Sequence, residues 1–137
     1  MSYKLGIVGS RVWTSRAGQV WNKKITNPKQ YVFDKMDFYV SKHGKPSLVI
    51  SGGAKGADTY GIQWAQARGI PIKEYKPHER LKRIAGFRHA AMTRNTDIVN
   101  NSDRVVAFWD KKSTGTLDTL TKAKKSKKKV SYFNVGD

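Results

Sequence analysis

The segment LVISGGAKGAD at residues 48–58 joins an apolar run to a loop with three glycines in five positions. A short apolar run without alternating polar residues is typical of a strand that is buried on both faces, as in a parallel sheet. Glycines after such a strand allow a ligand to approach the backbone amides, and a helix that starts there adds partial positive charge. The segment therefore predicts a strand-to-helix turn that binds an anionic group.

Strand-like and helix-like segments alternate along the rest of the chain. We expect strands at residues 4–8, 48–50, 70–75, 104–109 and 129–133. Helices are expected at residues 27–44, 56–68, 80–100 and 116–125, the third of them interrupted at Ala85 and Gly86. Parallel strands need a crossover, which a helix can supply. The sequence predicts an α/β fold, a single Rossmann-like domain over residues 1–137, with a mostly parallel sheet of about five strands and helices on both faces.

Helical spacing of apolar residues predicts which face of each helix packs on the sheet. Asn27 and Pro28 suit the cap and the first residue of the first helix. The apolar faces are expected at Phe33, Met36 and Val40 in the first helix, at Ile62, Trp64 and Ala65 in the second, and at Leu117, Leu120 and Ala123 in the last.

The composition excludes several kinds of chemistry. The 137 residues include no cysteine, which excludes disulfides, a thiol nucleophile and thiolate metal sites. The three histidines, His43, His78 and His89, lack the spacing of metal ligands, and we expect no metal and no cofactor. No apolar run has the length of a signal peptide core or a membrane span, so we expect a cytoplasmic protein without a membrane partner.

The chain is strongly basic, with 27 Lys and Arg against 10 Asp and Glu and a net charge of +17. This excess attracts polyanions, so single-stranded nucleic acid is a candidate partner. The basic residues are spread evenly along the chain, and a solvated basic surface is the alternative interpretation. The densest run contributes the nucleic-acid candidates Lys122, Lys124, Lys125, Lys127, Lys128 and Lys129.

Three strand-to-helix turns carry the residues that we predict to bind a nucleotide. Ligands of open parallel sheets bind at the carboxyl ends of the strands. The turns follow the strands expected at 4–8, 48–50 and 104–109, and the third helical region contributes two more residues. The predicted binding residues are Gly9, Ser10, Arg11, Ser51, Gly52, Gly53, Lys55, Gly56, Asp58, Arg94, Asn95, Ser113, Thr114, Gly115 and Thr116.

Different residue types in this set suit different parts of a nucleotide. Glycines and hydroxyls provide close contacts to phosphate, while Arg11, Lys55 and Arg94 neutralise its charge. Asp58 has two interpretations, a favourable partner of the helix dipole or an acceptor for ribose hydroxyls. Residues 10–27, with Trp13 and Trp21, are assigned to neither helix nor strand, and they form either a lid or a loop packed on the protein's own surface.

These motifs resemble those of the SLOG superfamily of Rossmann-like nucleotide-binding domains, which includes the DNA-processing Smf/DprA proteins and the Lonely Guy enzymes. The resemblance is greatest to the YspA-like, cpYpsA-related branch. It is carried by the three turns, by Ala85-Gly86, by Arg94-Asn95 and by the segment 107–110. It implies that the second and third turns face the phosphate of a nucleotide or a nucleotide-derived molecule. Relatives often pair through helices, so a homodimer is our default expectation.

One position departs from the pattern of the enzymes in this superfamily. Lonely Guy enzymes cleave the N-glycosidic bond of a nucleoside monophosphate, and their pattern Gly-Thr-x-x-Glu ends in a catalytic glutamate. Here Gly115-Thr116-Leu117-Asp118-Thr119 places a threonine at that position. Asp118 comes one residue early, a rotation of about 100° on a helix. The candidates for a replacement catalytic carboxylate are Asp58 and Asp118.

Three functional hypotheses follow. The leading one is binding of a nucleotide or nucleotide-derived small molecule by a sensor, carrier or sequestering protein. One alternative is an N-glycosidase or phosphoribohydrolase acting on a nucleoside monophosphate. The other is a protein that binds single-stranded nucleic acid through the glycine turns and the lysine run.

Overall fold

The computed structural model describes residues 2–10, 21–54 and 56–136. Within these residues, the chain forms five strands and five helices, with the third and fourth helices consecutive. Their order is β1 (Lys4–Gly9), α1 (Pro28–His43), β2 (Leu48–Ser51), α2 (Ala57–Ala67), β3 (Ile72–Glu74), α3 (Glu79–Ala85), α4 (Phe87–Asn100), β4 (Arg104–Trp109), α5 (Thr114–Lys125) and β5 (Lys129–Asn134).

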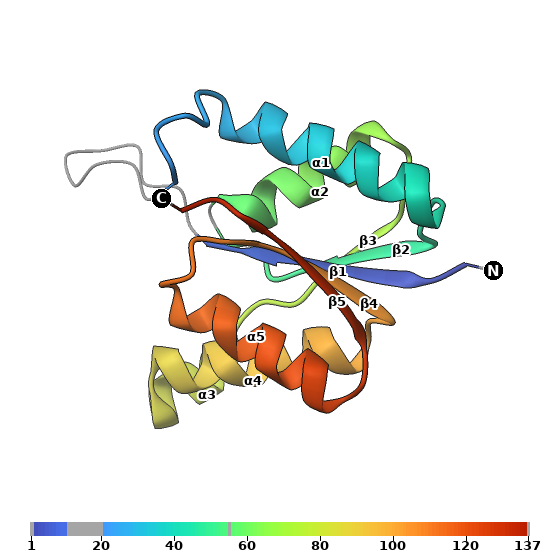
Figure 1. Ribbon diagram of the computed structural model, residues 1–137. Coiled ribbons are helices and arrows are strands. Elements are labelled where there is room, and N and C mark those ends of the chain that lie inside the picture. The colour runs from blue at the N-terminus through green and yellow to red at the C-terminus, as the bar shows by residue number, and fades with distance from the viewer. Residues whose placement is uncertain (1, 11–20, 55, 137) are drawn as a thin grey trace.

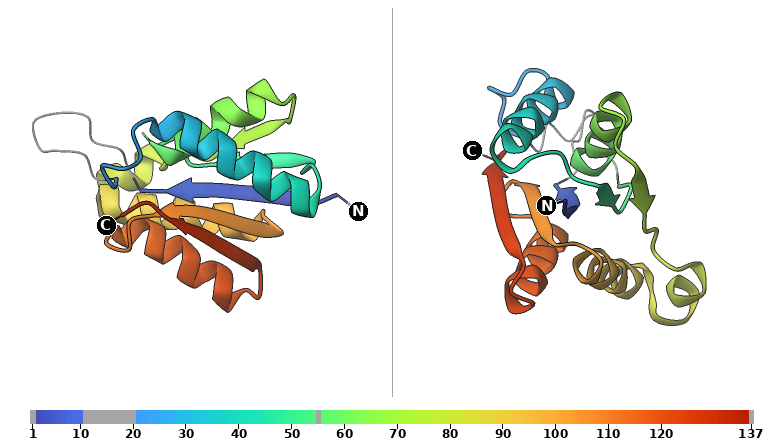
Figure 2. Two further views of the ribbon diagram at one scale, coloured as in Figure 1. Left: turned by 45° about the horizontal axis from the view of Figure 1, so that its top comes forward. Right: turned by 90° about the vertical axis from the view of Figure 1, so that its right-hand side faces the viewer.

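The strands form one parallel sheet in the order β3-β2-β1-β4-β5. Helices α1 and α2 cover one face, and α3, α4 and α5 cover the other (Figure 1). Figure 2 shows the same three layers from two further directions. This architecture confirms the predicted α/β Rossmann-like fold. The chain leaves β1 toward one face and β4 toward the other, so the ends of these neighbouring strands form the place where ligands of such sheets bind.

Each face of the sheet packs against its own apolar cluster. Leu5 and Ile7 of β1 belong to the cluster under α1 and α2, whereas Val8 belongs to the cluster under α4 and α5. Strand β4 alternates in the same way, with Val106 on one face and Val105 on the other. The central strands are therefore buried on both faces, as their continuous apolar runs predicted.

Local signals for the helix ends are confirmed. Asn27 caps α1 by accepting a hydrogen bond from the Gln30 amide at 3.1 Å, and Pro28 is the first helical residue. The interruption expected at Ala85 and Gly86 separates α3 from α4, and Gly86 adopts a φ of 91°. That conformation favours glycine, so the break is encoded locally.

The predicted helix faces are confirmed in part, since the structure buries Met36 in α1, Trp64 and Ala65 in α2, and Leu120 and Ala123 in α5. In α1 the buried residues are Val32, Met36 and Tyr39, while Phe33 and Val40 are only partly buried. Both sets share Met36 and have helical spacing, so contacts with the sheet decide between them. In α2 the close contact with β1 comes from Gly61, where a Cβ would lie 2.7 Å from the Ile7 Cγ2 atom.

In α5 the helix begins at Thr114, two residues before its predicted start, and Leu117 is 46% exposed. Thr116 and Thr119 are buried in its place. Their hydroxyls have partners in the helix and its N-cap, because the Thr119 hydroxyl donates to the Gly115 carbonyl and the Thr116 hydroxyl lies 3.3 Å from that of the N-cap residue Ser113. Satisfied hydroxyls make the burial of two threonines inexpensive.

Trp21 packs in the core rather than over a ligand. Its ring stacks on Phe108 with a centroid distance of 6.3 Å, and its Nε1 donates to the Ser10 carbonyl at 3.2 Å. Arg11 and Trp13, like the rest of the segment 11–20, lie outside the described residues. In the part of the chain that the structure describes, no helix is both long and apolar enough to cross a bilayer.

Candidate functional site

A cavity of about 580 Å³ opens at the carboxyl ends of β1 and β4, between α4 and the start of α5. It brings together residues from all three predicted turns and from α4. The predicted binding residues that line it are Gly9, Ser10, Asp58, Arg94, Asn95, Ser113, Thr114, Gly115 and Thr116. Arg11 and Lys55 were also predicted, and both lie outside the described residues.

The first turn holds the ends of β1 and β4 together. The Ser10 amide donates to the Phe108 carbonyl at 2.8 Å, and the Ser10 hydroxyl accepts from the Asp110 amide at 3.1 Å. Gly9 lies where α2 approaches, because a Cβ there would be 2.4 Å from the Ala57 Cβ. Ser10 is 1% exposed, so its hydroxyl supports the cavity wall.

The third turn is shaped by Asp110, which directly follows β4. Its Oδ1 accepts hydrogen bonds from the amides of Lys112 at 2.9 Å and Ser113 at 2.7 Å. The loop is thereby folded so that α5 begins at the cavity wall. No side chain of the described residues caps this helix start.

The first turn of α5 is suited to an anion. The amides of Thr114, Gly115 and Thr116 precede the first intrahelical bond, in which Leu117 donates to the Ser113 carbonyl at 3.2 Å. Such amides need an outside acceptor and carry the positive end of the helix dipole. A Cβ at Gly115 would meet nothing within 4 Å, so a ligand can reach this backbone.

The second turn is arranged differently from our prediction, because the protein's own side chains occupy it. The Gly53 amide donates to the Ser51 hydroxyl at 3.2 Å, and the Ala54 amide donates to the Asp58 Oδ2 at 3.3 Å. A Cβ at Gly52 would lie 2.4 Å from the Arg94 Nη1. At Gly53 it would lie 2.6 Å from the Glu74 carboxyl carbon.

Four other residues predicted in the second turn do not line the larger cavity. Ser51 is fully buried and does not line the cavity, and Gly56 is the buried N-cap of α2 with a φ of 99°. Gly52 and Gly53 line a second cavity of about 210 Å³. This second cavity shares Ala54, Phe87 and Arg94 with the larger one.

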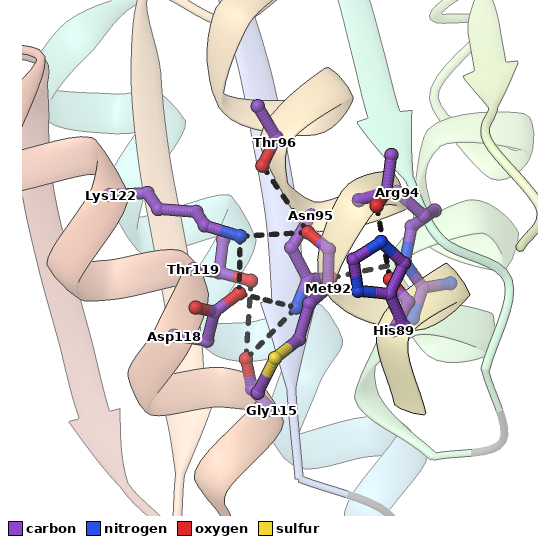
Figure 3. Close-up of polar contacts among 10 residues, drawn as sticks. His89, Met92, Arg94, Asn95, Thr96, Gly115, Asp118, Thr119 and Lys122 are labelled. Carbon is purple, nitrogen blue, oxygen red and sulfur yellow. Dashed lines mark hydrogen bonds and ion pairs between the residues drawn. The ribbon is translucent and has the colours of Figure 1, made fainter. Parts of the chain in front are cut away.

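Arg94 and Asn95 connect the second and third turns through α4. The Arg94 Nη1 donates to the Gly52 carbonyl at 3.0 Å, and its Nε donates to the Asn95 Oδ1 at 3.1 Å. The Asn95 Nδ2 donates to the Gly115 carbonyl at 3.3 Å and to the Asp118 Oδ2 at 3.2 Å (Figure 3). These bonds fix the first turn of α5 relative to α4.

The two candidate catalytic carboxylates have structural partners. Asp118 pairs with Lys122 at 2.8 Å and accepts from Asn95, and it does not line the cavity. The Lys122 ammonium also donates to the Met92 carbonyl at 2.8 Å, which ties α5 to α4 (Figure 3). Asp58 does line the cavity, but it is 5% exposed and accepts from the Ala54 amide.

Several lining residues were absent from our predicted set. Asp110 and Lys112 could have been found by position, since they directly follow a predicted strand. Arg88 and Phe87 follow Gly86, which marks a helix start facing the cavity. Among the described residues, no group of three His, Asp or Glu side chains could hold a metal ion.

The predicted nucleic-acid lysines lie away from the cavity. They occupy the last turns of α5 and the turn into β5, whereas the first turn of α5 lines the cavity (Figure 1). Lys124, Lys125, Lys127 and Lys129 are exposed. Lys128 is half-buried, and Lys122 is held by Asp118 and Met92.

Comparison with known proteins gives a family and a fold. The sequence model of the YspA, cpYpsA-related SLOG family matches residues 7–81. No curated protein matches the sequence.

Solved structures share the fold at low identity. DNA processing protein A (DprA) from Streptococcus pneumoniae is 19% identical with a TM-score of 0.60, over 96% of this chain and 50% of that one. The protein TM1055 is 20% identical with a TM-score of 0.63, over 95% and 72%. DNA processing protein A from Helicobacter pylori, whose structure concerns its single-stranded DNA binding mode, is 20% identical with a TM-score of 0.62, over 94% and 64%. The chain therefore spans about half the length of the pneumococcal protein.

Proposed function

Because the chain belongs to the YspA, cpYpsA-related SLOG family, we propose that it binds a nucleotide or nucleotide-derived small molecule in the cavity at the ends of β1 and β4. The first turn of α5 is the observation that carries this proposal. Its amides precede the first intrahelical bond and face a cavity that Gly115 leaves open. Helix starts of this kind bind phosphate.

The other lining groups fit the same ligand. Ser113, Thr114 and Thr116 supply hydroxyls beside the α5 amides, and Arg88 and Lys112 supply positive charge. The carboxylates of Asp58 and Asp110 accept backbone amides, which disperses their negative charge. The volume of about 580 Å³ lies within the range of about 300–1,000 Å³ that small-molecule sites have.

We propose binding rather than turnover. Cleavage of an N-glycosidic bond would need a carboxylate positioned near the anomeric carbon. Asp118 is instead paired with Lys122 outside the cavity lining, and Asp58 supports the second turn. A sensor, carrier or sequestering role is consistent with these contacts.

Calorimetric titration with a panel of nucleotides tests the proposal. We expect at least one of AMP, GMP, CMP, UMP, ADP-ribose and cyclic AMP to bind the intact chain. Arg88→Ala should weaken binding by about tenfold or more, because a charge-assisted hydrogen bond to phosphate is lost. Arg83→Ala is the matched control, since Arg83 is exposed on α3 and does not line the cavity. No heat and no thermal stabilisation at millimolar ligand would contradict the proposal.

Single-stranded nucleic-acid binding is a second candidate function. It is favoured by the exposed lysines at the end of α5, by the net charge of +17, and by the fold shared with the DNA-binding protein of Helicobacter pylori. A basic surface of this kind attracts a nucleic-acid backbone without reading its sequence.

A further inference from the structure

Phe87 is a large apolar side chain that stays 53% exposed within a cavity wall. It is the first residue of α4 and directly follows Gly86, whose φ of 91° turns the chain between α3 and α4. The ring thus projects from a helix start rather than packing under the helix. An exposed phenyl ring in a hollow gains burial when a flat ligand covers it.

Phe87 lies at the boundary of two cavities. It lines both the cavity of about 580 Å³ and the cavity of about 210 Å³, together with Ala54 and Arg94. The Lys82 ammonium, which belongs to the smaller cavity, lies 5.6 Å from the centroid of the ring. A ligand that covers the ring therefore has access to both cavities.

The two cavities have different chemistry. The larger one contains the first turn of α5, which is the proposed phosphate site. The smaller one contains the carboxylates of Glu74 and Glu79, the ammonium groups of Lys76 and Lys82, and the backbone of Gly52 and Gly53. Each carboxylate is paired with a lysine, Glu74 with Lys76 at 3.6 Å and Glu79 with Lys82 at 2.9 Å. This mixture of donors and acceptors suits the polar edge of a neutral ring.

We propose that Phe87 is the stacking platform for a nucleobase, with the edge of the base in the smaller cavity and the phosphate at the first turn of α5. The inference rests on the proposed nucleotide-binding function and narrows its ligand to one with an aromatic base. It makes the base, and not only the sugar phosphate, a source of affinity. Every base has a flat face, so the platform alone accepts any of them.

The experiment compares nucleoside 5′-monophosphates with ribose 5-phosphate by calorimetry. AMP, GMP, CMP and UMP are titrated alongside ribose 5-phosphate into the intact chain and its variants. We expect Phe87→Ala to weaken the best-bound nucleotide by about tenfold or more. Ribose 5-phosphate binding should change by less than about twofold, because its phosphate contacts remain. Phe87→Tyr should retain nucleotide affinity, because it keeps an aromatic face.

Phe38→Ala is the matched control. Phe38 has the same exposed fraction, 53%, and a similar cation contact, with the Lys42 ammonium 4.7 Å from its ring centroid. It lies on α1, on the opposite face of the sheet, and should leave both affinities unchanged (Figure 1).

The outcomes separate this inference from the function on which it rests. Equal affinity for nucleotides and ribose 5-phosphate, or an equal loss of both in Phe87→Ala, would overturn the base platform and leave the phosphate site in place. Absence of binding by all five compounds, and by ADP-ribose and cyclic AMP as well, would overturn both. Since Phe87 is half exposed, circular dichroism should show that Phe87→Ala remains folded.

Discussion

Gly9 and Gly115 both line the cavity, but a methyl group would meet very different surroundings at the two positions. At Gly9 it would lie 2.4 Å from the Ala57 Cβ and 2.7 Å from the Phe108 carbonyl oxygen. At Gly115 it would meet nothing within 4 Å. The first glycine is therefore required by packing, whereas the second leaves room for a ligand.

We predict that Gly9→Ala and Gly115→Ala have opposite effects. Gly9→Ala should lower the free energy of unfolding by about 1–3 kcal/mol, the usual cost of overpacking. Gly115→Ala should keep or raise it, because alanine is favoured over glycine in a helix by about 0.5–1 kcal/mol. It should still weaken nucleotide binding by crowding the α5 amides. Urea unfolding followed by nucleotide titration measures both effects, and a stable Gly115→Ala with unchanged affinity would argue against phosphate at α5.

We predicted one role for the turn glycines, close access of a ligand to the backbone, but the fold uses them in several ways. The pattern of small residues after each strand placed the predicted site at the strand ends, where a cavity lies. It did not separate Gly115, which is open, from Gly52 and Gly53, whose space is filled by Arg94 and Glu74. The difference depends on side chains 42 and 21 positions away in the chain, and no local pattern of glycines records them.

The carboxylate of Asp37 joins α1 to the end of α2. Asp37 on α1 accepts hydrogen bonds from the Trp64 Nε1 at 2.9 Å and from the Arg68 Nε and Nη2 at 3.0 and 2.7 Å. The Arg68 hydrogen bonds are the main cause that lowers the pKa of Asp37 below its ordinary value of 3.8. A lowered pKa in the folded state contributes stability above pH 3.8, and this contribution is lost as the pH falls through the folded pKa.

We predict that Asp37→Asn lowers the melting temperature at neutral pH and that this difference shrinks as the pH falls below 3.8. The loss should be small, because the Asp37 and Arg68 side chains are 45% and 42% exposed. Asp34→Asn is the control, since Asp34 accepts a hydrogen bond from the Gln30 side chain on the same helix. Thermal unfolding of the three proteins from pH 2.5 to 7 provides the measurement. A constant difference over that range would contradict the assigned role of the carboxylate.

Element boundaries were easier to predict than element faces. The cap at Asn27 and the break at Gly86 are local signals, and both appear where they were expected. The faces of α1 and α5 depend on what each helix meets. The hydroxyls of the buried Thr116 and Thr119 have partners in the N-cap and the first turn of α5, which a hydropathy pattern does not reveal.

The two candidate functions use opposite ends of α5. The first turn of this helix lines the cavity, and the exposed lysines follow at its other end. A helix of 12 residues is about 18 Å long. That length exceeds the Debye length of about 8–10 Å at physiological salt, so charges at one end act weakly on a ligand at the other.

We therefore predict that neutralising this end of α5 affects nucleic acid and not nucleotide. The triple variant Lys124→Gln, Lys125→Gln and Lys129→Gln should lower affinity for a single-stranded DNA oligonucleotide. It should also reduce the slope of log affinity against log salt by about 0.7 for each lysine that contacts phosphate. Nucleotide affinity should be unchanged. Fluorescence anisotropy of a labelled oligonucleotide at several salt concentrations, with parallel calorimetry for the nucleotide, measures both.

A second triple variant distinguishes a defined surface from the general positive charge. Lys23→Gln, Lys24→Gln and Lys45→Gln remove the same charge from exposed positions before α1 and after it. If the net charge of +17 acts as a whole, both triple variants should weaken oligonucleotide binding equally. If the end of α5 is a binding surface, the first variant should lose clearly more affinity and more salt dependence than the second. Equal losses would therefore assign nucleic-acid binding to the diffuse charge of the molecule and remove the lysine run as a site.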